Sequence, residues 1–274
     1  MSTWCPVHAF DHARLAAARV QAHHATQWLA RTAYAYVPPQ PDDRHGNLGW
    51  DAAFGGLMSH PLPDGAQLGL RVTDLTLALF TTDASAPHDI FPLGGRHDPD
   101  ACAWLMGHAG MRNLDPSALD APLPYMLAEK PDGSAYSVDA EALDALAAWF
   151  TNANAALGAV REHIVARGLA APPVCCWPHH FDLDSLVTVA PGRTTGIGFE
   201  PGDAYYDEPY FYVSVFPAPD AATLPKLPAV GHWHTQNFTA AIATAQKILG
   251  AADQGGAVQE FLRAAVDATI KALS

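Results

Sequence analysis

The sequence lacks the features of nucleic-acid-binding and membrane-spanning proteins. Lys and Arg number 15 against 28 Asp and Glu, the formal net charge is −13, and no Lys/Arg cluster is present. Displacing counterions from phosphates needs a basic face, so nucleic acid is not expected as a partner, and anionic membranes are disfavoured. No apolar run approaches the roughly 20 residues that span a bilayer.

Cysteine is also scarce, and the chain contains only Cys5, Cys102, Cys175 and Cys176. Adjacent cysteines rarely bridge to each other, and no Cys-x-x-Cys zinc knuckle is present. The opening Met-Ser-Thr-Trp-Cys-Pro has no basic region followed by an apolar one, so a secretory leader is not expected. These observations predict reduced thiols and a cytoplasmic location.

Several familiar motifs are missing as well. The glycine pairs at 55–56, 94–95 and 255–256 match neither a dinucleotide fingerprint nor a phosphate loop, and no Gly-x-Ser-x-Gly elbow occurs. What the chain does contain is apolar material. Hydrophobic residues make up 49% of its 274 residues and charged residues 16%, which favours a folded core over disorder.

Hydrophobic periodicity predicts both helices and strands. The helices are expected at Phe10–Tyr36, Asp98–Gly110, Ser137–Gly168, Phe238–Leu249 and Ala257–Leu273. The strands are expected at Phe54–Met58, Gln67–Thr81, Val174–Val189, Thr194–Phe199 and Tyr210–Phe216. This order predicts an α+β fold with antiparallel strands packed against long helices, built as two similar helix-strand-helix halves or as one domain.

The expected domain boundary lies in a segment punctuated by Pro and Asp. Residues 114–134 read as a connection between an N-terminal α+β half, 1–113, and a C-terminal α+β half, 135–274. A single compact domain fits the pattern equally well.

The candidate functional residues are concentrated between Cys175 and His234. If Trp177–Leu186 is extended, His180 and Asp182 share one face, while Trp177 and His179 share the other. An imidazole and a carboxylate at this spacing can form half of a site for a divalent metal, or a general base oriented by an acid.

A second cluster is Gly231-His232-Trp233-His234. In an extended segment His232 and His234 point the same way and Trp233 points opposite. Together with His180 and Asp182 they predict a site for one divalent transition metal ion. The alternative is that these histidines are structural, because 14 histidines in 274 residues make close pairs common by chance.

The segment between the clusters is rich in aromatic and acidic residues. Five residues are candidates to line a ligand-binding site: Tyr205, Tyr206, His179, Trp177 and Trp233. Such a surface suits a cationic or sugar-like molecule. The alternation within Tyr210–Phe216 instead indicates ordinary sheet packing, and we favour that interpretation there.

These segments resemble an uncharacterised bacterial family. Its features are a Trp-Pro-His-His-Phe-Asp strand and a Gly-His-Trp-His motif, matched here at 177–182 and 231–234, with further likeness at 201–203 and 208–210. The resemblance covers most of the chain from Asn47 onward. It implies no activity, because the family is a domain of unknown function.

Two functions of different classes follow as hypotheses. The first is a metal-dependent enzyme that uses the four predicted ligands, with Asp203 or Glu208 as an acid–base group. The second is a non-catalytic protein whose Tyr205–Tyr212 loop closes over a small molecule. Ala-rich exposed helix faces are also compatible with a homodimer.

Overall fold

The computed structural model describes residues 4–82, 84–127 and 134–274. Within these ranges the strands form two antiparallel sheets accompanied by helices, which confirms the predicted α+β class. No helix in the same ranges is long and apolar enough to cross a membrane.

The chain divides into two compact units. Counting described residues only, the N-terminal unit comprises Ala13–Ala147 and Cys176–Phe181, and the C-terminal unit comprises Met1–His12, Ala148–Cys175 and Asp182–Ser274.

The division differs from the predicted boundary. Residues 114–127 lie inside the N-terminal unit, and residues 128–133 of the predicted connection lie outside the described residues. The chain passes from one unit to the other within helix α3 (Ala140–Ala166). Since a helix carries the chain across, no change in composition marks the boundary. The similarity of the two halves stays a prediction.

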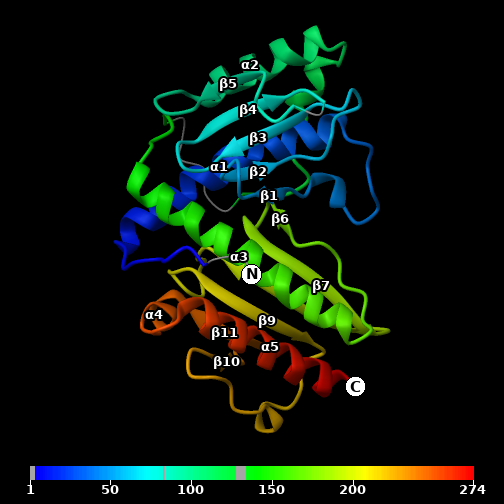
Figure 1. Ribbon diagram of the computed structural model, residues 1–274. Helices are drawn as coiled ribbons and strands as arrows, with labels where there is room; N and C mark the ends of the chain where they lie inside the picture. The colour runs from blue at the N-terminus through cyan, green and yellow to red at the C-terminus, as the bar shows by residue number, and fades with distance from the viewer. Residues whose placement is uncertain (1–3, 83, 128–133) are drawn as a thin grey trace. The chain divides into compact units, whose positions relative to one another are not determined.

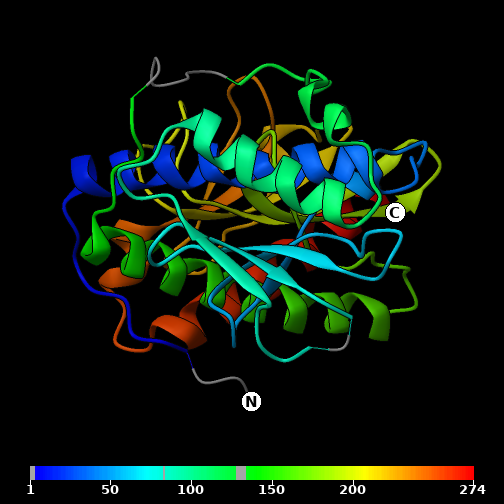
Figure 2. The same cartoon turned by 90° about the horizontal axis from the view of Figure 1, so that it is seen from above.

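The N-terminal unit contains a five-stranded sheet in the order β1-β2-β3-β4-β5. Its strands are β1 (Gly49–Asp51), β2 (Gly56–Met58), β3 (Gln67–Arg71), β4 (Thr76–Phe80) and β5 (Asp89–Pro92). Helices α1 (His12–Tyr36) and α2 (Asp98–Met111) lie on the same face of this sheet (Figures 1 and 2). Two short 3-10 turns, η1 (Arg44–Gly46) and η2 (Pro116–Asp120), lie in its loops.

One of the N-terminal predictions needs refinement and another is confirmed. The strand expected at Gln67–Thr81 is a hairpin, because Leu75 adopts a left-handed backbone conformation (φ 51°) and reverses the chain between β3 and β4. Helix α1 ends where expected, just before Val37-Pro38, since a proline disfavours helical geometry in the residue before it.

The segment Pro178–Phe181, expected to be extended, is instead a turn held against α1. The carbonyl oxygen of Trp177 accepts hydrogen bonds from the backbone N–H groups of His180 (3.0 Å) and Phe181 (2.7 Å). Phe181 has a left-handed backbone (φ 65°), which costs a bulky residue about 1 kcal/mol or more. Its side chain is buried, and its ring stacks on His23 of α1 at 5.4 Å. This packing stabilises the turn.

Two side chains of α1 fix the same turn through one acceptor. The carbonyl oxygen of Pro178 accepts from His23 Nε2 (2.8 Å) and from Gln27 Nε2 (2.8 Å). Tyr125 completes the network by donating its hydroxyl hydrogen to Gln27 Oε1 (2.7 Å). Burial lowers the pKa of His23 from 6.5 to about 4, so this imidazole is neutral near pH 7.

We expect the buried His23 to make stability depend on pH. Because its pKa is lowered by folding, the unfolded chain takes up the proton first, and stability present above pH 6.5 is lost as the pH falls toward 4. The loss is on the order of 3 kcal/mol. Urea unfolding at several pH values checks it. His23→Phe, which keeps a ring over Phe181, should flatten the profile, and His88→Phe at an exposed position should not. Equal profiles for all three proteins would contradict the role of His23.

The second sheet has six strands in the order β10-β11-β9-β8-β7-β6, and all of them except β6 lie wholly in the C-terminal unit. Its strands are β6 (Cys175–Trp177), β7 (Asp182–Ala190), β8 (Arg193–Glu200), β9 (Tyr210–Phe216), β10 (His232–His234) and β11 (Ala240–Thr244). The helices are α4 (Ala245–Leu249), α5 (Gln254–Leu273), most of α3 and the 3-10 turn η3 (Ala221–Thr223). Helices α3 and α5 cover one face of the sheet (Figure 1).

The alternation along the strands separates an aromatic core from a polar face. Phe199 of β8 and Phe211 of β9 are paired neighbours whose rings lie 5.3 Å apart. Trp149 of α3 stacks on Phe199 at 6.2 Å, so these rings face the helices. Tyr210 and Tyr212 alternate with Phe211 and therefore point to the opposite face. This confirms the predicted packing of Tyr210–Phe216 as a two-sided strand.

One predicted helix is partly wrong. Residues 240–244, inside the helix expected at Phe238–Leu249, form β11, a fully buried strand between β9 and β10. Its sequence, Ala-Ala-Ile-Ala-Thr, has no strong strand preference, and small side chains suit an interior strand covered on both faces. Tertiary burial overrides local helix propensity here.

A glycine on β8 allows one tyrosine to lie across the sheet. Gly198 pairs with Tyr212, and the Tyr212 ring passes over it to donate a hydrogen bond to Asp182 Oδ2 at 2.9 Å. A Cβ atom at position 198 would overlap this ring. Burial, followed by the charge of Asp182, raises the pKa of Tyr212 well above its usual value, so the hydroxyl remains a donor.

We therefore expect opposite effects from two Gly→Ala changes. Gly198→Ala should lower the free energy of unfolding by roughly 1–3 kcal/mol, because it overpacks the space of the Tyr212 ring. Gly158→Ala in α3 should raise it by about 0.5–1 kcal/mol, because the new methyl group has no atom within 4 Å and alanine favours helix. Urea denaturation of both variants checks this, and equal stabilities would contradict it.

Candidate functional site

The four residues predicted as one metal site do not come together. His232 and His234 lie on β10, at one edge of the six-stranded sheet, whereas Asp182 begins β7 near the other edge. Four inter-strand steps separate β10 from β7, or about 19 Å. His180 lies in the turn before β7, so the expectation that it shares a strand face with Asp182 is also wrong.

Two of the four predicted ligands do lie close together, beside a tyrosine. His232 and His234 share a face of β10, as their spacing predicts, and both approach the hydroxyl of Tyr206. The Tyr206 oxygen lies 3.0 Å from His232 Nε2 and 3.0 Å from His234 Nδ1. Trp233 points the other way and donates its indole hydrogen to the carbonyl oxygen of Pro225 (2.8 Å).

The loop that carries Tyr206 is organised by one carboxylate. Asp203 Oδ1 accepts from the backbone N–H groups of Tyr205 (2.8 Å) and Tyr206 (2.9 Å). Its second oxygen accepts from the hydroxyl of Tyr210 (2.9 Å). Asp203, a predicted acid–base group, thus makes three hydrogen bonds that hold the loop in shape.

The other predicted acid–base group also has a structural contact. Glu208 Oε2 accepts from the backbone N–H of Gln246 at 2.6 Å, in the first turn of α4. A carboxylate there satisfies a helix N–H group that has no partner within the helix. Nothing in these contacts assigns catalysis to Asp203 or Glu208.

The remaining predicted lining residues lie in separate places. Tyr205 packs edge-on against His234 at 5.7 Å, beside Tyr206. His179 belongs to the N-terminal unit, where its ring lies 5.4 Å from Tyr125 and 6.0 Å from Trp177. Burial lowers the pKa of His179.

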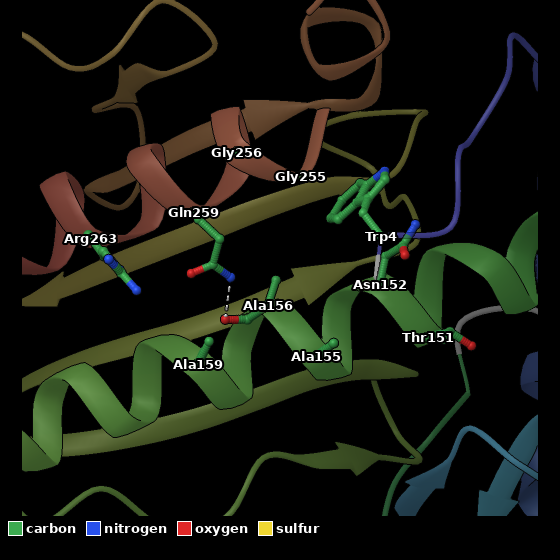
Figure 3. A pocket seen from close by; sticks show the side chains of 10 residues that line it. All are labelled: Trp4, Thr151, Asn152, Ala155, Ala156, Ala159, Gly255, Gly256, Gln259 and Arg263. Atoms are coloured by element: carbon green, nitrogen blue, oxygen red, sulfur yellow. Dashed lines mark hydrogen bonds between the residues drawn. The ribbon is translucent and has the colours of Figure 1, made fainter. Parts of the chain in front are cut away.

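A pocket that the sequence analysis missed lies between α3 and α5 within the C-terminal unit (Figure 3). Its volume is about 340 Å³. The residues that line it are Trp4, Thr151, Asn152, Ala155, Ala156, Ala159, Gly255, Gly256, Gln259 and Arg263. Small residues of both helices form its walls, and Gln259 and Arg263 reach from α5 toward α3.

The chain's first described residues form one wall of this pocket. Trp4 packs edge-on against Trp149 at 6.4 Å, and its indole N–H donates to Gln254 Oε1 at 3.0 Å. A Cβ atom on Gly255 would approach Trp4 to 2.9 Å, so this glycine lets the indole lie close to α5. Gly255 therefore has a packing role.

Two amide side chains hold the backbone of this N-terminal segment. The buried Asn152 accepts from the N–H of Cys5 and donates to its carbonyl oxygen, both at 2.8 Å. Gln254 likewise accepts from the N–H of Val7 at 3.2 Å and donates to the carbonyl oxygen of Val7 at 3.0 Å. An asparagine inside the apolar helix around Trp149 and Phe150 was the sequence feature that could have indicated this contact.

Comparisons with known proteins identify no match to this chain. No family model, curated protein or solved structure matches it. The resemblance to a bacterial family of unknown function stays a prediction.

We expect Asn152→Ala to destabilise the protein by about 1–3 kcal/mol, because it leaves both backbone groups of Cys5 without their buried partners. Asn154→Ala, two residues along the same helix at a half-buried position, is the matched control and should change stability little. Urea unfolding measures both. Equal losses would show that the amide contact to Cys5 contributes nothing specific.

Proposed function

We propose that the protein binds a small amphipathic carboxylate in the pocket between α3 and α5. The observation that carries this proposal is a concave, mainly apolar site with a few polar groups at defined positions. Its volume of about 340 Å³ falls at the small end of the range for ligand sites. The occupant is therefore a small molecule rather than a peptide or a large cofactor.

The apolar walls favour a flat hydrophobic body. The Trp4 indole offers a broad ring, and the methyl groups of Ala155, Ala156 and Ala159 leave room beside it. An aromatic ring stacked on or edge-on to the indole would gain about 0.5–1.5 kcal/mol beyond its buried area.

Arg263 favours an anionic end group. Its exposed side chain lines the pocket and makes no ion pair among the described residues. A guanidinium binds a carboxylate through paired hydrogen bonds. The position of Arg263 at an exposed rim lets the charged group keep part of its hydration.

Gln259 favours a donor on the ligand. Its Nε2 donates to the carbonyl oxygen of Ala156 at 3.0 Å, which fixes the orientation of the amide. Its Oε1 is buried and accepts no hydrogen bond from a described residue. Leaving a buried acceptor unpaired costs about 1–3 kcal/mol, and a hydroxyl or amine of the ligand that reaches it would remove that cost.

The residues of this pocket favour binding over catalysis. None of those lining it is His, Cys, Asp, Glu, Lys or Tyr. Acid–base catalysis draws mainly on these side chains, and the hydroxyl of Thr151 would need one of them as a neighbouring base to act as a nucleophile. The proposal therefore belongs to the class of non-catalytic small-molecule binding, at a different place from the Tyr205–Tyr212 loop.

The test uses three probes: phenylpropanoate, its ring-hydroxylated analogue and the methyl ester of phenylpropanoate. We expect the two acids to bind and to raise the melting temperature, and the ester to bind at least about tenfold more weakly, because it lacks the charge that pairs with Arg263. Isothermal titration calorimetry and thermal shift measure this.

Two variants and their controls locate the site. Ala159→Phe should abolish binding by filling the pocket, and Arg263→Gln should weaken the acids about tenfold without changing the ester. Val165→Phe on the exposed side of α3 and Lys271→Gln on α5 should bind like the parent protein. Absence of acid binding, or equal losses in the controls, would overturn the proposal.

A further inference from the structure

Beyond the pocket, we infer that His232, His234 and Tyr206 form a three-ligand site for a copper(II)-type transition metal ion. The donor atoms are Nε2 of His232, Nδ1 of His234 and the phenol oxygen of Tyr206. Within the described part of the chain, no three His, Cys, Asp or Glu side chains are grouped as a metal site. The tyrosine oxygen is what completes this set.

The tautomer of His234 suits a metal ligand. Its Nε2 lies 2.7 Å from the carbonyl oxygen of Gln236, which can only accept, so Nε2 carries the hydrogen. Nδ1 then presents a lone pair toward Tyr206. Metal-binding histidines commonly donate the other ring N–H to a backbone carbonyl in this way, which fixes the ring and raises its basicity.

The donor types favour copper(II). The Tyr206 oxygen lies within hydrogen-bond distance, 3.0 Å, of each imidazole nitrogen, so one ion that replaces the shared hydrogens reaches all three donors after small side-chain shifts. Two imidazole nitrogens and a phenol oxygen are mixed nitrogen and oxygen ligands, which suit copper(II) or nickel(II). Copper(II) binds more tightly to such ligands than the other divalent first-row ions.

The three side chains are held in place by packing. Phe238 stacks on His234 with ring centres 4.4 Å apart, and β10 is paired along its length with β11. Asp203 fixes the backbone of Tyr206 from the other side. A site whose ligands are already ordered loses less entropy when the ion binds.

The surroundings leave access for an ion and for further ligands. His232 is exposed, so water can complete the coordination. Two charges act in opposite directions. Asp203 lies near Tyr206 and favours a cation, whereas Lys247 lies near His232 and disfavours one. When the metal binds, the phenol proton of Tyr206 passes to solvent and the oxygen coordinates as phenolate.

The experiment titrates copper(II) chloride into untagged protein and records visible absorption and electron paramagnetic resonance. One ion per chain should bind, with two nitrogen ligands and a phenolate-to-copper charge-transfer band. Tyr206→Phe should remove that band and weaken binding at least about tenfold. The double variant His232→Ala/His234→Ala should abolish binding at this stoichiometry. His88→Ala removes an exposed histidine elsewhere and should change neither result.

Other outcomes would overturn the site. These are a copper spectrum with no phenolate band, a band that persists in Tyr206→Phe, or equal binding by the double variant. The band in the parent protein is informative even if the double variant fails to fold, and circular dichroism shows whether it has folded. The pocket-filling variant Ala159→Phe should bind copper normally, which separates this inference from the proposed carboxylate site.

Discussion

The C-terminal unit depends on a cluster of aromatic rings buried between its helices and its sheet. Phe199 lies at the centre, with Trp149 stacked at 6.2 Å and Phe150 and Phe211 in contact on its other sides. Because side chains of a strand alternate between faces, burying Phe199 and Phe211 against the helices fixes which residues of β8 and β9 face away. Trp4 packs onto the same cluster, so the N-terminal segment is positioned by it as well.

Both proposed sites follow from this arrangement, on opposite faces of the sheet. On the helix side, Trp4 and the small residues of α3 and α5 leave a pocket beside the aromatic cluster. On the far side, the same alternation presents His232 and His234, and the loop held by Asp203 brings Tyr206 to them. The acidic residues near that loop are used mainly to shape it, as the contacts of Asp203 and Glu208 show.

Hydrophobic periodicity predicted the structure correctly where that structure depends on residues close together in the sequence. The long helices, the strand at Tyr210–Phe216 and the shared direction of His232 and His234 follow from periods of 3.6 and 2. It failed at Ala240–Thr244, where burial between two strands outweighs helix propensity, and at Pro178–Phe181, where contacts to His23 and Gln27 stabilise a turn. For the turn, the deciding partners lie 155 and 151 residues away in the chain.

The sequence by itself determined the α+β class, the acidic surface and which side chains share a face along a strand, because these depend on composition and on local geometry. Only the tertiary structure decided which strands are neighbours, and so separated Asp182 from the two histidines of β10. It also brought Trp4 against Gly255, about 250 residues along the chain. Strand order and the docking of a terminal segment are set by burial of surfaces distant in sequence, and no local period records them.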